Sequence, residues 1–293
     1  MPAMASMKEY QGPIIDTHAF LGSSEAFKVL EPTDPYFKEE RFKRTQFLVM
    51  PFSAAQNLEV IEKVAGDDKF LGSYVMFNPN EASPLHVRED GFDAVRGASN
   101  HENVVGMKSH PSIFRIPMND KRFNPYYELA SRRKLPVLLH TASSGKEYDS
   151  AGMATEVMER NPDLKLILAH FGGLKPNYME EAAKLLDKFP NLYLNTTGLD
   201  QMGRNRQVSN STFERRVLHD LSDDEVVSMR RDAAHIIKGV VAKHPKKVLF
   251  GSDTGFHLPE DFSIWPLQEL TVGEQFQVLY FNPKKLFRNM KAA

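Results

Sequence analysis

Four side chains that can carry acid-base or metal chemistry each close a short apolar run of the chain. His18 ends IIDTH, His140 ends PVLLH, His170 ends LILAH and Asp253 ends VLFGSD. Imidazole and carboxylate suit zinc or another divalent first-row metal, and a catalytic zinc keeps an open position for water. Such water loses a proton near neutral pH and becomes a nucleophile. Asp253 fits two roles, as a metal ligand or as the base that accepts this proton.

Each of these residues also has a purely structural interpretation. A single buried histidine often hydrogen-bonds a neighbouring loop, and His18 has Asp16 within reach for this purpose. Asp253 could cap the turn that follows it. The functional interpretation gains weight only if all four side chains reach one place, which depends on the elements that carry them.

Eight apolar runs are the candidates for those elements. They span residues 12–16, 45–50, 70–77, 104–108, 135–140, 164–170, 192–197 and 247–253. Runs this apolar are typical of parallel strands buried on both faces. Amphipathic segments that predict helices span residues 54–64, 124–134, 154–161, 176–189, 223–243, 271–281 and 282–290. The alternation of strand and helix predicts an α/β protein.

A closed barrel explains the pattern better than an open, doubly wound sheet. Eight units in 293 residues match the usual size of a (β/α)8 barrel. Six polar residues lie at or just past the carboxyl ends of predicted strands, where barrel enzymes assemble their sites: His18, Lys108, His140, His170, Asn195 and Asp253. We therefore predict one TIM barrel that occupies residues 1–293 as a single domain.

Further residues are candidates for substrate contact. Lys108 and His110 follow the fourth run, Asn195 ends the seventh, and His257 lies shortly after Asp253. Lys108 would bind an anionic group, and the alternative is a salt-bridged or solvated lysine. His257 would line the pocket, and the alternative is a histidine that is simply exposed to solvent. The connection 198–223 is long enough to act as a lid over the barrel mouth. Its arginines form either a carboxylate clamp or a solvated face: Arg204, Arg206, Arg215 and Arg216.

Composition narrows the class of partner. The formal net charge is -1, from 37 basic and 38 acidic side chains, so the chain has no field that would attract nucleic acid. Cysteine is absent, which excludes disulfides and thiolate ligands. The sequence has no signal-peptide pattern and no apolar stretch that predicts a membrane span. We expect a cytoplasmic protein with a small-molecule substrate and no membrane or nucleic-acid partner; a homodimer is an open option.

In their order along the chain, IIDTH, GMKSHP, LPVLLHT, LKLILAHFGG, NLYLNTT, VLFGSD and NPKKLF resemble the amidohydrolase-related family (amidohydrolase 2). This family belongs to the metal-dependent hydrolase superfamily and includes carboxymuconate-semialdehyde-type decarboxylases. The resemblance implies that His18 and His140 bind a metal, most simply zinc. It further implies that His170 polarises substrate or water and that Asp253 binds the metal and carries protons.

The chain departs from the family pattern at Phe20. The strand-one motif of the family is His-x-His, and Phe20 stands where the second histidine belongs. Phenylalanine cannot bind a metal, so the candidate ligands are His18, His140 and Asp253, with His170 as a fourth. This set is large enough for one zinc ion.

Three functions remain open at this point. The first is a metal-dependent hydrolase that attacks a small, anionic carbonyl compound with metal-activated water, and a metal-free hydrolase of a lactone is its variant. The second is a non-oxidative decarboxylase of a small carboxylic acid, in which Asp253 or His170 protonates the carbanion. The third is a barrel that has lost catalysis and binds only a ligand or a partner protein.

Overall fold

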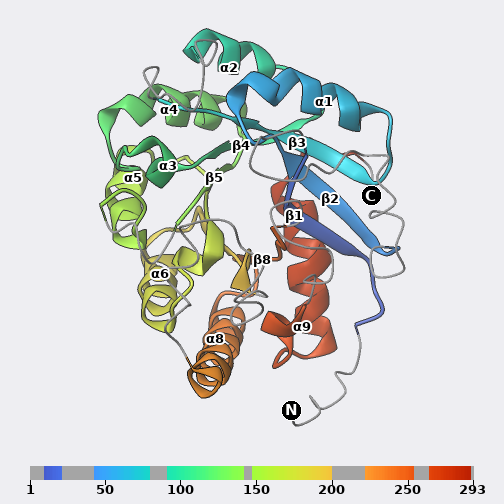
Figure 1. Cartoon of the computed structure of the whole chain (residues 1–293), viewed down its shortest axis with the longest axis vertical. Helices are drawn as coiled ribbons and strands as arrows, with labels where there is room; N and C mark the ends of the chain where they lie inside the picture. Colours follow the sequence, from blue (N-terminus) through green and yellow to red (C-terminus); the bar gives the residue numbers. More distant parts are fainter. Residues whose placement is uncertain are drawn as a thin grey trace.

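Eight parallel strands form the centre of the molecule and helices surround them (Figure 1). The computed structural model describes residues 10–21, 43–79, 91–141, 147–199, 222–253 and 264–291. Within these residues the strands are β1 (Ile14–Phe20), β2 (Thr45–Met50), β3 (Phe70–Met76), β4 (Val104–Ser109), β5 (Val137–Leu139), β6 (Leu166–Leu168), β7 (Leu192–Asn195) and β8 (Val248–Leu249). Each strand pairs in parallel with the next strand along the chain, so the order in the sheet follows the sequence.

The sheet curves until its last strand meets its first. The backbone N–H of Thr17 in β1 donates to the carbonyl of Phe250 at 3.0 Å, just beyond β8. A second bond, from the N–H of Asp253 to the carbonyl of His18, measures 2.9 Å. These bonds form a seam between the two ends of the sheet, and the predicted (β/α)8 barrel is confirmed.

The helices lie outside the strands. They are α1 (Asn57–Ala65), α2 (Phe92–Ala98), α3 (Pro111–Phe114), α4 (Asn124–Arg133), α5 (Ala154–Arg160), α6 (Pro176–Lys188), α8 (Asp223–Lys243), α9 (Val272–Phe276) and α10 (Asn282–Leu286). A π-helical turn, Gln277–Phe281, joins α9 to α10, so the two predicted terminal helices run into one another. Among the helices described, none is long and apolar enough to cross a membrane.

Local sequence signals fix several helix ends. The hydroxyl of Ser222 accepts from the N–H of Glu225 at 3.3 Å, and the Glu225 carboxylate accepts from the N–H of Ser222 at 2.7 Å. This reciprocal capping box begins α8. Pro176 begins α6, at a position where a backbone N–H is not needed. The short helices α2 and α3 were not predicted from the sequence.

Strand side chains pack in two layers. One cluster joins alternate strand residues such as Ile15, Leu48 and Leu138, and it fills the barrel interior. The neighbours of Leu138 in β5 belong to the larger cluster between strands and helices. Phe287, which follows α10, joins the interior cluster and meets the ring of Tyr74 edge-on at 5.9 Å. The C-terminal segment therefore closes the barrel at the end opposite to the strand carboxyl termini.

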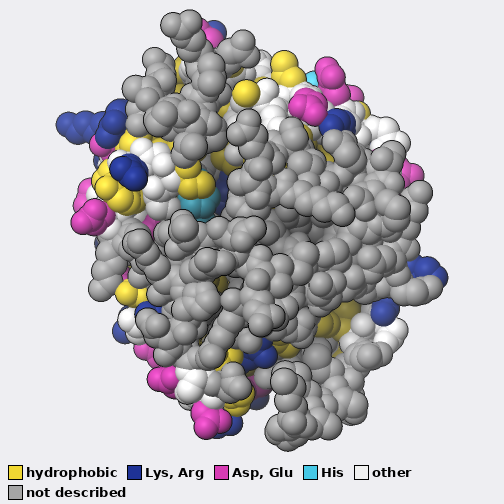
Figure 2. All heavy atoms as spheres, in the orientation of Figure 1, with side chains coloured by type: hydrophobic (Ala, Val, Ile, Leu, Met, Phe, Trp, Pro, Cys, Tyr) yellow, Lys and Arg dark blue, Asp and Glu magenta, His cyan; other side chains and the backbone are white. Residues whose placement is uncertain are grey.

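Charged side chains of both signs mark the outside of the molecule. In Figure 2 the described acidic and basic side chains are interspersed around the rim of the face that is shown. This mixture agrees with the balanced formal charge of the sequence, -1. A small-molecule partner fits such a surface better than a polyanion.

Candidate functional site

The predicted site residues lie where the strands end. His18 is in β1, His140 directly follows β5, and His170 lies in the tight turn after β6. His170 has a φ of 52° and Asp253 a φ of 65°, in the left-handed region that residues other than glycine rarely adopt. Surrounding contacts must enforce such conformations, and this is common at functional sites.

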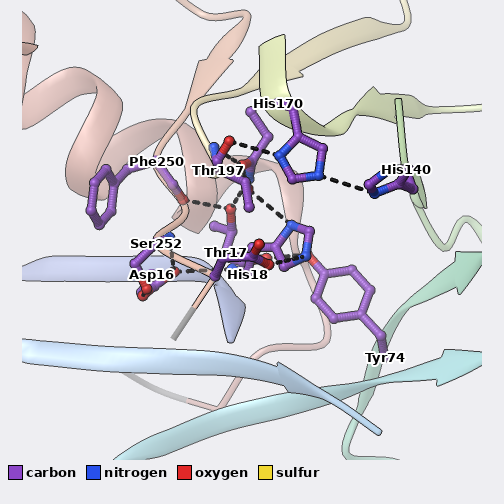
Figure 3. Close-up of polar contacts among 11 residues, drawn as sticks. Asp16, Thr17, His18, Tyr74, His140, His170, Thr197, Phe250 and Ser252 are labelled. Carbon is purple, nitrogen blue, oxygen red and sulfur yellow. Dashed lines mark hydrogen bonds and ion pairs between the residues drawn. The ribbon is translucent and has the colours of Figure 1, made fainter. Parts of the chain in front are cut away.

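His18, which Figure 3 labels, forms a buried pair with Asp253 beside the seam. Nε2 of His18 lies 3.2 Å from Oδ1 of Asp253, and the two side chains are 1% and 9% exposed. On the other side of the ring, Nδ1 of His18 lies 2.9 Å from the hydroxyl oxygen of Thr197. Both ring nitrogens therefore face oxygens, and the ring is held between a carboxylate and a hydroxyl.

A chain of hydrogen bonds continues behind His18. The hydroxyl of Thr197 donates to Oδ1 of Asn195, which also accepts from the N–H of Thr197 at 2.8 Å. Nδ2 of Asn195 donates to the hydroxyl of Thr17 at 2.7 Å, and that hydroxyl donates to the carbonyl of Phe250 at 2.6 Å. Asn195 is completely buried, so these contacts support the site from behind. Substrate contact by Asn195 stays a prediction.

His140 and His170 form a second pair next to the first. Nε2 of His170 lies 3.0 Å from Nδ1 of His140, and Nδ1 of His170 donates to the carbonyl of Thr197 at 3.0 Å. Nε2 of His140 lies 3.8 Å from the carboxylate of Asp149, which is fully buried. The ring centroids of His18 and His170 are 6.2 Å apart. The four predicted residues are thus brought together in two polar pairs.

Lys108 lies in the same region at the end of β4. Its side chain is buried, and Nζ has no hydrogen-bond partner in the described part of the chain. Burial lowers the pKa of Lys108 to about 7, although the negative charges of Asp253 and Asp149 act in the opposite direction. The solvated alternative for Lys108 is therefore wrong. His110 stacks on His140, with ring centroids 3.5 Å apart, and its Nδ1 lies 3.2 Å from the hydroxyl of Ser112.

His18, His110 and His140 are neutral near pH 7. Burial lowers the pKa of His18, His110 and His140 well below the usual value, and the nearby Lys108 lowers each further. A neutral imidazole has one nitrogen that donates and one that accepts a hydrogen bond. The neighbouring oxygens and nitrogens therefore decide which ring nitrogen of each histidine carries its proton.

Asp16 and Ser252 join the two segments that carry His18 and Asp253. Oδ1 of Asp16 accepts from the N–H of His18 at 3.0 Å and from the N–H of Ser252 at 3.1 Å, and the Ser252 hydroxyl donates to Oδ2. Burial raises the pKa of Asp16 to about 7, although these hydrogen bonds act to lower it. The contact between His18 and Asp16 thus exists, but it involves the backbone of His18 and leaves the imidazole for the site.

Sequence reasoning missed several residues of this arrangement. Thr197 and Ser252 each stand within two residues of a predicted site residue, whereas Asp16 was named only as a structural partner of His18. This proximity was the available signal for them. Asp149 gave no such signal, because it lies in a loop well beyond its strand and only the fold brings it to His140.

Phe20 occupies the place that the strand-one motif of the family gives to a second histidine. Its ring lies 5.6 Å from that of His18 and stacks on Phe52 at 4.8 Å. Within the described residues, no group of three or more histidine, aspartate and glutamate side chains could hold a metal ion. His18 and Asp253 face one another, whereas His140 turns toward His170 and Asp149. This donor set therefore does not fit a metal with three protein ligands.

Two expectations concern residues outside the described part of the chain. His257 lies in the undescribed range 254–263, and most of the predicted lid, including its arginines, lies in the range 200–221. Their roles stay predictions.

Comparison with known proteins gives one family match. The family model described as amidohydrolase matches residues 47–289, which is most of the chain. No curated protein sequence matches the chain.

Solved structures of similar fold include hydrolases and decarboxylases. A putative 2-pyrone-4,6-dicarboxylic acid hydrolase from Pseudomonas putida is 14% identical, with a TM-score of 0.65 over 94% of this chain and 98% of that chain. A dihydroxybenzoic acid decarboxylase from Polaromonas with bound manganese is 12% identical, with a TM-score of 0.63 over 94% and 97%. A 5-carboxyvanillate decarboxylase from Sphingomonas paucimobilis is 12% identical, with a TM-score of 0.58 over 94% and 99%. At these identities the similarity shows the fold.

Proposed function

The chain belongs to the amidohydrolase family and is an enzyme of that family. We propose that it hydrolyses a small anionic carbonyl compound, most simply a lactone or ester. Metal-dependent hydrolysis fits the family as a whole, and decarboxylases share its fold. The choice of hydrolysis for this chain rests on the arrangement of its own residues.

The observation that carries the proposal is the buried contact between His18 and Asp253. A carboxylate held 3.2 Å from an imidazole is well placed to act as a general base. Its side chain keeps 9% exposure, so it is not fully closed to water. Lys108 adds an amine within the electrostatic range of Asp253, and a bound anion would supply the partner that its Nζ needs.

Hydrolysis at this pair consumes only water and the substrate. Asp253 takes a proton from water while the water oxygen attacks the carbonyl carbon of the substrate. The bond between that carbon and the leaving oxygen breaks, and the proton passes from Asp253 to the leaving oxygen. His18 orients Asp253. Polarisation of the carbonyl oxygen by His170 stays a prediction, because Nδ1 of His170 already donates to the carbonyl of Thr197.

Zinc stays a prediction for this chain. Divalent metals occur in the family, as the bound manganese of the Polaromonas decarboxylase illustrates. No step above uses a metal, because the described donors supply too few ligands. Elemental analysis of protein purified without added metal or chelator tests this directly. Zinc in a one-to-one ratio with the chain, together with loss of turnover after its removal, would favour metal-activated water.

The function is tested with a panel of lactones, esters and amides that carry a carboxylate, with acid release as the readout. Asp253→Asn should reduce turnover by about 100-fold or more, because an amide is a poor base. Asp187→Asn is the control, since Asp187 is exposed on α6 and pairs with Lys243. An Asp253→Asn protein with an unchanged melting curve and a near-parental rate would rule out this role.

Non-oxidative decarboxylation is the second candidate. The closeness of Lys108 to Asp253 favours decarboxylation. The Lys108 cation would hold the substrate carboxylate while protonated Asp253 gives its proton to the carbanion. Release of carbon dioxide from aromatic carboxylic acids, without acid release from the lactone panel, would identify this activity. No turnover in either panel, together with no bound metal, would favour a barrel that only binds a ligand or a partner.

A further inference from the structure

Lys108 carries the amine that lies inside the barrel at the end of β4. It pairs in register with Leu138 of β5, whose side chain belongs to the cluster that fills the barrel interior. The preceding residue, Met107, packs in the cluster between strands and helices. Successive side chains of a strand point to opposite faces, so both neighbours place the side chain of Lys108 on the interior face.

The amine at the end of this side chain has no polar contact. Lys108 is 1% exposed, and within the described residues its Nζ makes no hydrogen bond. A buried ammonium ion without a partner is costly, whereas a neutral amine is tolerated in such a place. The pKa of Lys108 agrees with this, because burial lowers it to about 7. Much of the amine is therefore unprotonated near neutral pH and keeps its electron pair.

The surroundings of this amine are those of the proposed active site. Several charged or titratable side chains lie within electrostatic range of Lys108: His18, His110, His140, Asp149 and Asp253. The backbone carbonyl of Lys108 accepts from the N–H of Phe77 at 2.9 Å, so β4 is bonded to the end of β3 at this point. The next residue, Ser109, donates its hydroxyl to the carbonyl of Phe77, also at 2.9 Å. The chain that carries the amine is thus held in place beside the site.

We propose that Lys108 is a nucleophile that forms an imine with a small aldehyde or ketone in this site. Lysines that are removed from water suit this reaction, because the neutral amine supplies the attacking electron pair. Hydrolysis as proposed above makes no bond to Lys108. The inference therefore goes beyond the proposed function and gives the site a second kind of chemistry.

The reaction needs no oxidant or reductant. The electron pair of Nζ forms a bond to the carbonyl carbon, and one electron pair of the C=O double bond moves to the oxygen. Both hydrogens of the neutral amine leave with this oxygen as water, and a C=N double bond remains. Water reverses these steps and restores Lys108. When protonated, the imine withdraws electrons from the neighbouring carbon, and Asp253 and Asp149 favour positive charge at this position.

Reductive trapping tests the proposal without any need for turnover. The full chain is treated at pH 7 with propanal and cyanoborohydride, which reduces an imine to a stable secondary amine, and its peptides are analysed by mass spectrometry. Exposed Lys184 of α6 is the internal reference. An ordinary exposed lysine has roughly one neutral amine in 2,500 at pH 7, so Lys108 should be labelled at least about 10-fold faster than Lys184. The ratio should fall at pH 10, where exposed lysines also lose their proton.

Lys108→Arg is the matched variant, because it keeps a basic side chain and removes the nucleophilic amine. It should lose the label at position 108 and keep the label on Lys184, and a melting curve shows whether it is folded. If it does not fold, the ratio of the two labels in the parent decides alone.

Labelling of Lys108 at pH 7 that is no faster than that of Lys184 would overturn the proposal. Acid release from the lactone and ester panel in such a protein would still support the proposed hydrolysis. Fast labelling of Lys108 with no turnover in either substrate panel would support imine formation and count against the proposed function alone.

Discussion

At the scale of single residues, burial favours the neutral form of four basic side chains of the site. His18, His110 and His140 have pKa values well below the usual one because they are buried, and Lys108 is held to a pKa of about 7 for the same reason. Buried groups of this kind respond strongly to any ion that enters. Two predictions concern Lys108 and Phe20, the two most unusual residues of the site.

Lys108 should make the stability of the protein increase as the pH rises above 7. Its pKa is about 7 in the folded protein and about 10.4 in the unfolded chain, so the unfolded chain binds more protons between these values. The free energy of unfolding should therefore rise from pH 7 to 10. Urea unfolding of Lys108→Met should lack this rise, whereas Lys184→Met, at an exposed lysine of α6, should keep it. Equal pH slopes in the two variants would contradict a depressed Lys108 pKa.

Phe20→His should create the third metal ligand that the described donors lack. The ring at position 20 lies 5.6 Å from that of His18, and residues two apart in a strand point to the same face. Replacing a buried ring by imidazole should cost on the order of 2 kcal/mol without metal, through a void and an added polar group. Added zinc should then raise the melting temperature of the variant more than that of the parent, because it binds the folded state. Equal zinc responses in thermal melting and calorimetry would show that His18 and position 20 do not share a metal site.

At the scale of elements, the strands point the chain toward the site, and the turns after them carry the side chains that form its hydrogen bonds. The strands β5, β6 and β8 are short, and their functional side chains project from the segments that follow. Asp16 and Ser252 fasten the first strand to the segment after the last. Close approach between these segments requires the absence of a side chain at Gly251.

Gly251→Ala should destabilise the protein by about 1–3 kcal/mol, the usual cost of overpacking a buried position. Its Cβ atom would lie 2.6 Å from polar atoms of both Asn195 and Thr197. The matched control is Gly239→Ala in α8, where a Cβ atom meets nothing within 4 Å. Alanine suits a helix interior better than glycine, so this change should stabilise by about 0.5–1 kcal/mol. Urea unfolding gives both values, and effects of the same sign would contradict the packing described here.

At the scale of the whole molecule, the two ends of the barrel have different tasks. The strand carboxyl termini carry His18, Lys108, His140 and Asp253, and the opposite end is closed by the C-terminal segment. There the N–H of Lys291 donates to the carbonyl of Leu71 at 3.0 Å. Changes at this second end should alter stability without altering the chemistry.

Asn282→Ala tests this division. The buried amide of Asn282 donates to the carbonyls of Pro245 at 2.9 Å and Val248 at 2.7 Å, and so joins α10 to β8. Its loss should cost about 1–3 kcal/mol, because buried carbonyls lose their partner. Asn191→Ala is the control, since that amide makes an exposed bond of 2.9 Å to Pro162 and its loss should cost about 0.5 kcal/mol or less. Chemical unfolding measures both, and equal losses would contradict the buried role of Asn282.

The sequence by itself determined the barrel, the order of its strands and the rim on which His18, His140, His170 and Asp253 meet. It could do so because buried parallel strands appear as apolar runs, and the residue after each run falls on one end of the barrel. The family resemblance was equally readable, since its motifs lie at those same positions, and so was the anomaly of Phe20.

Only the tertiary structure decided which of these residues face one another. His18 pairs with Asp253, and His140 pairs with His170 and lies near Asp149, because side-chain direction depends on turn geometry that no period in the sequence records. The burial of Lys108 and the double contact of Thr197 likewise arise from segments far apart in the chain. Hydrogen-bond direction is a property of the assembled network, so only the folded chain could determine where the protons of the site lie.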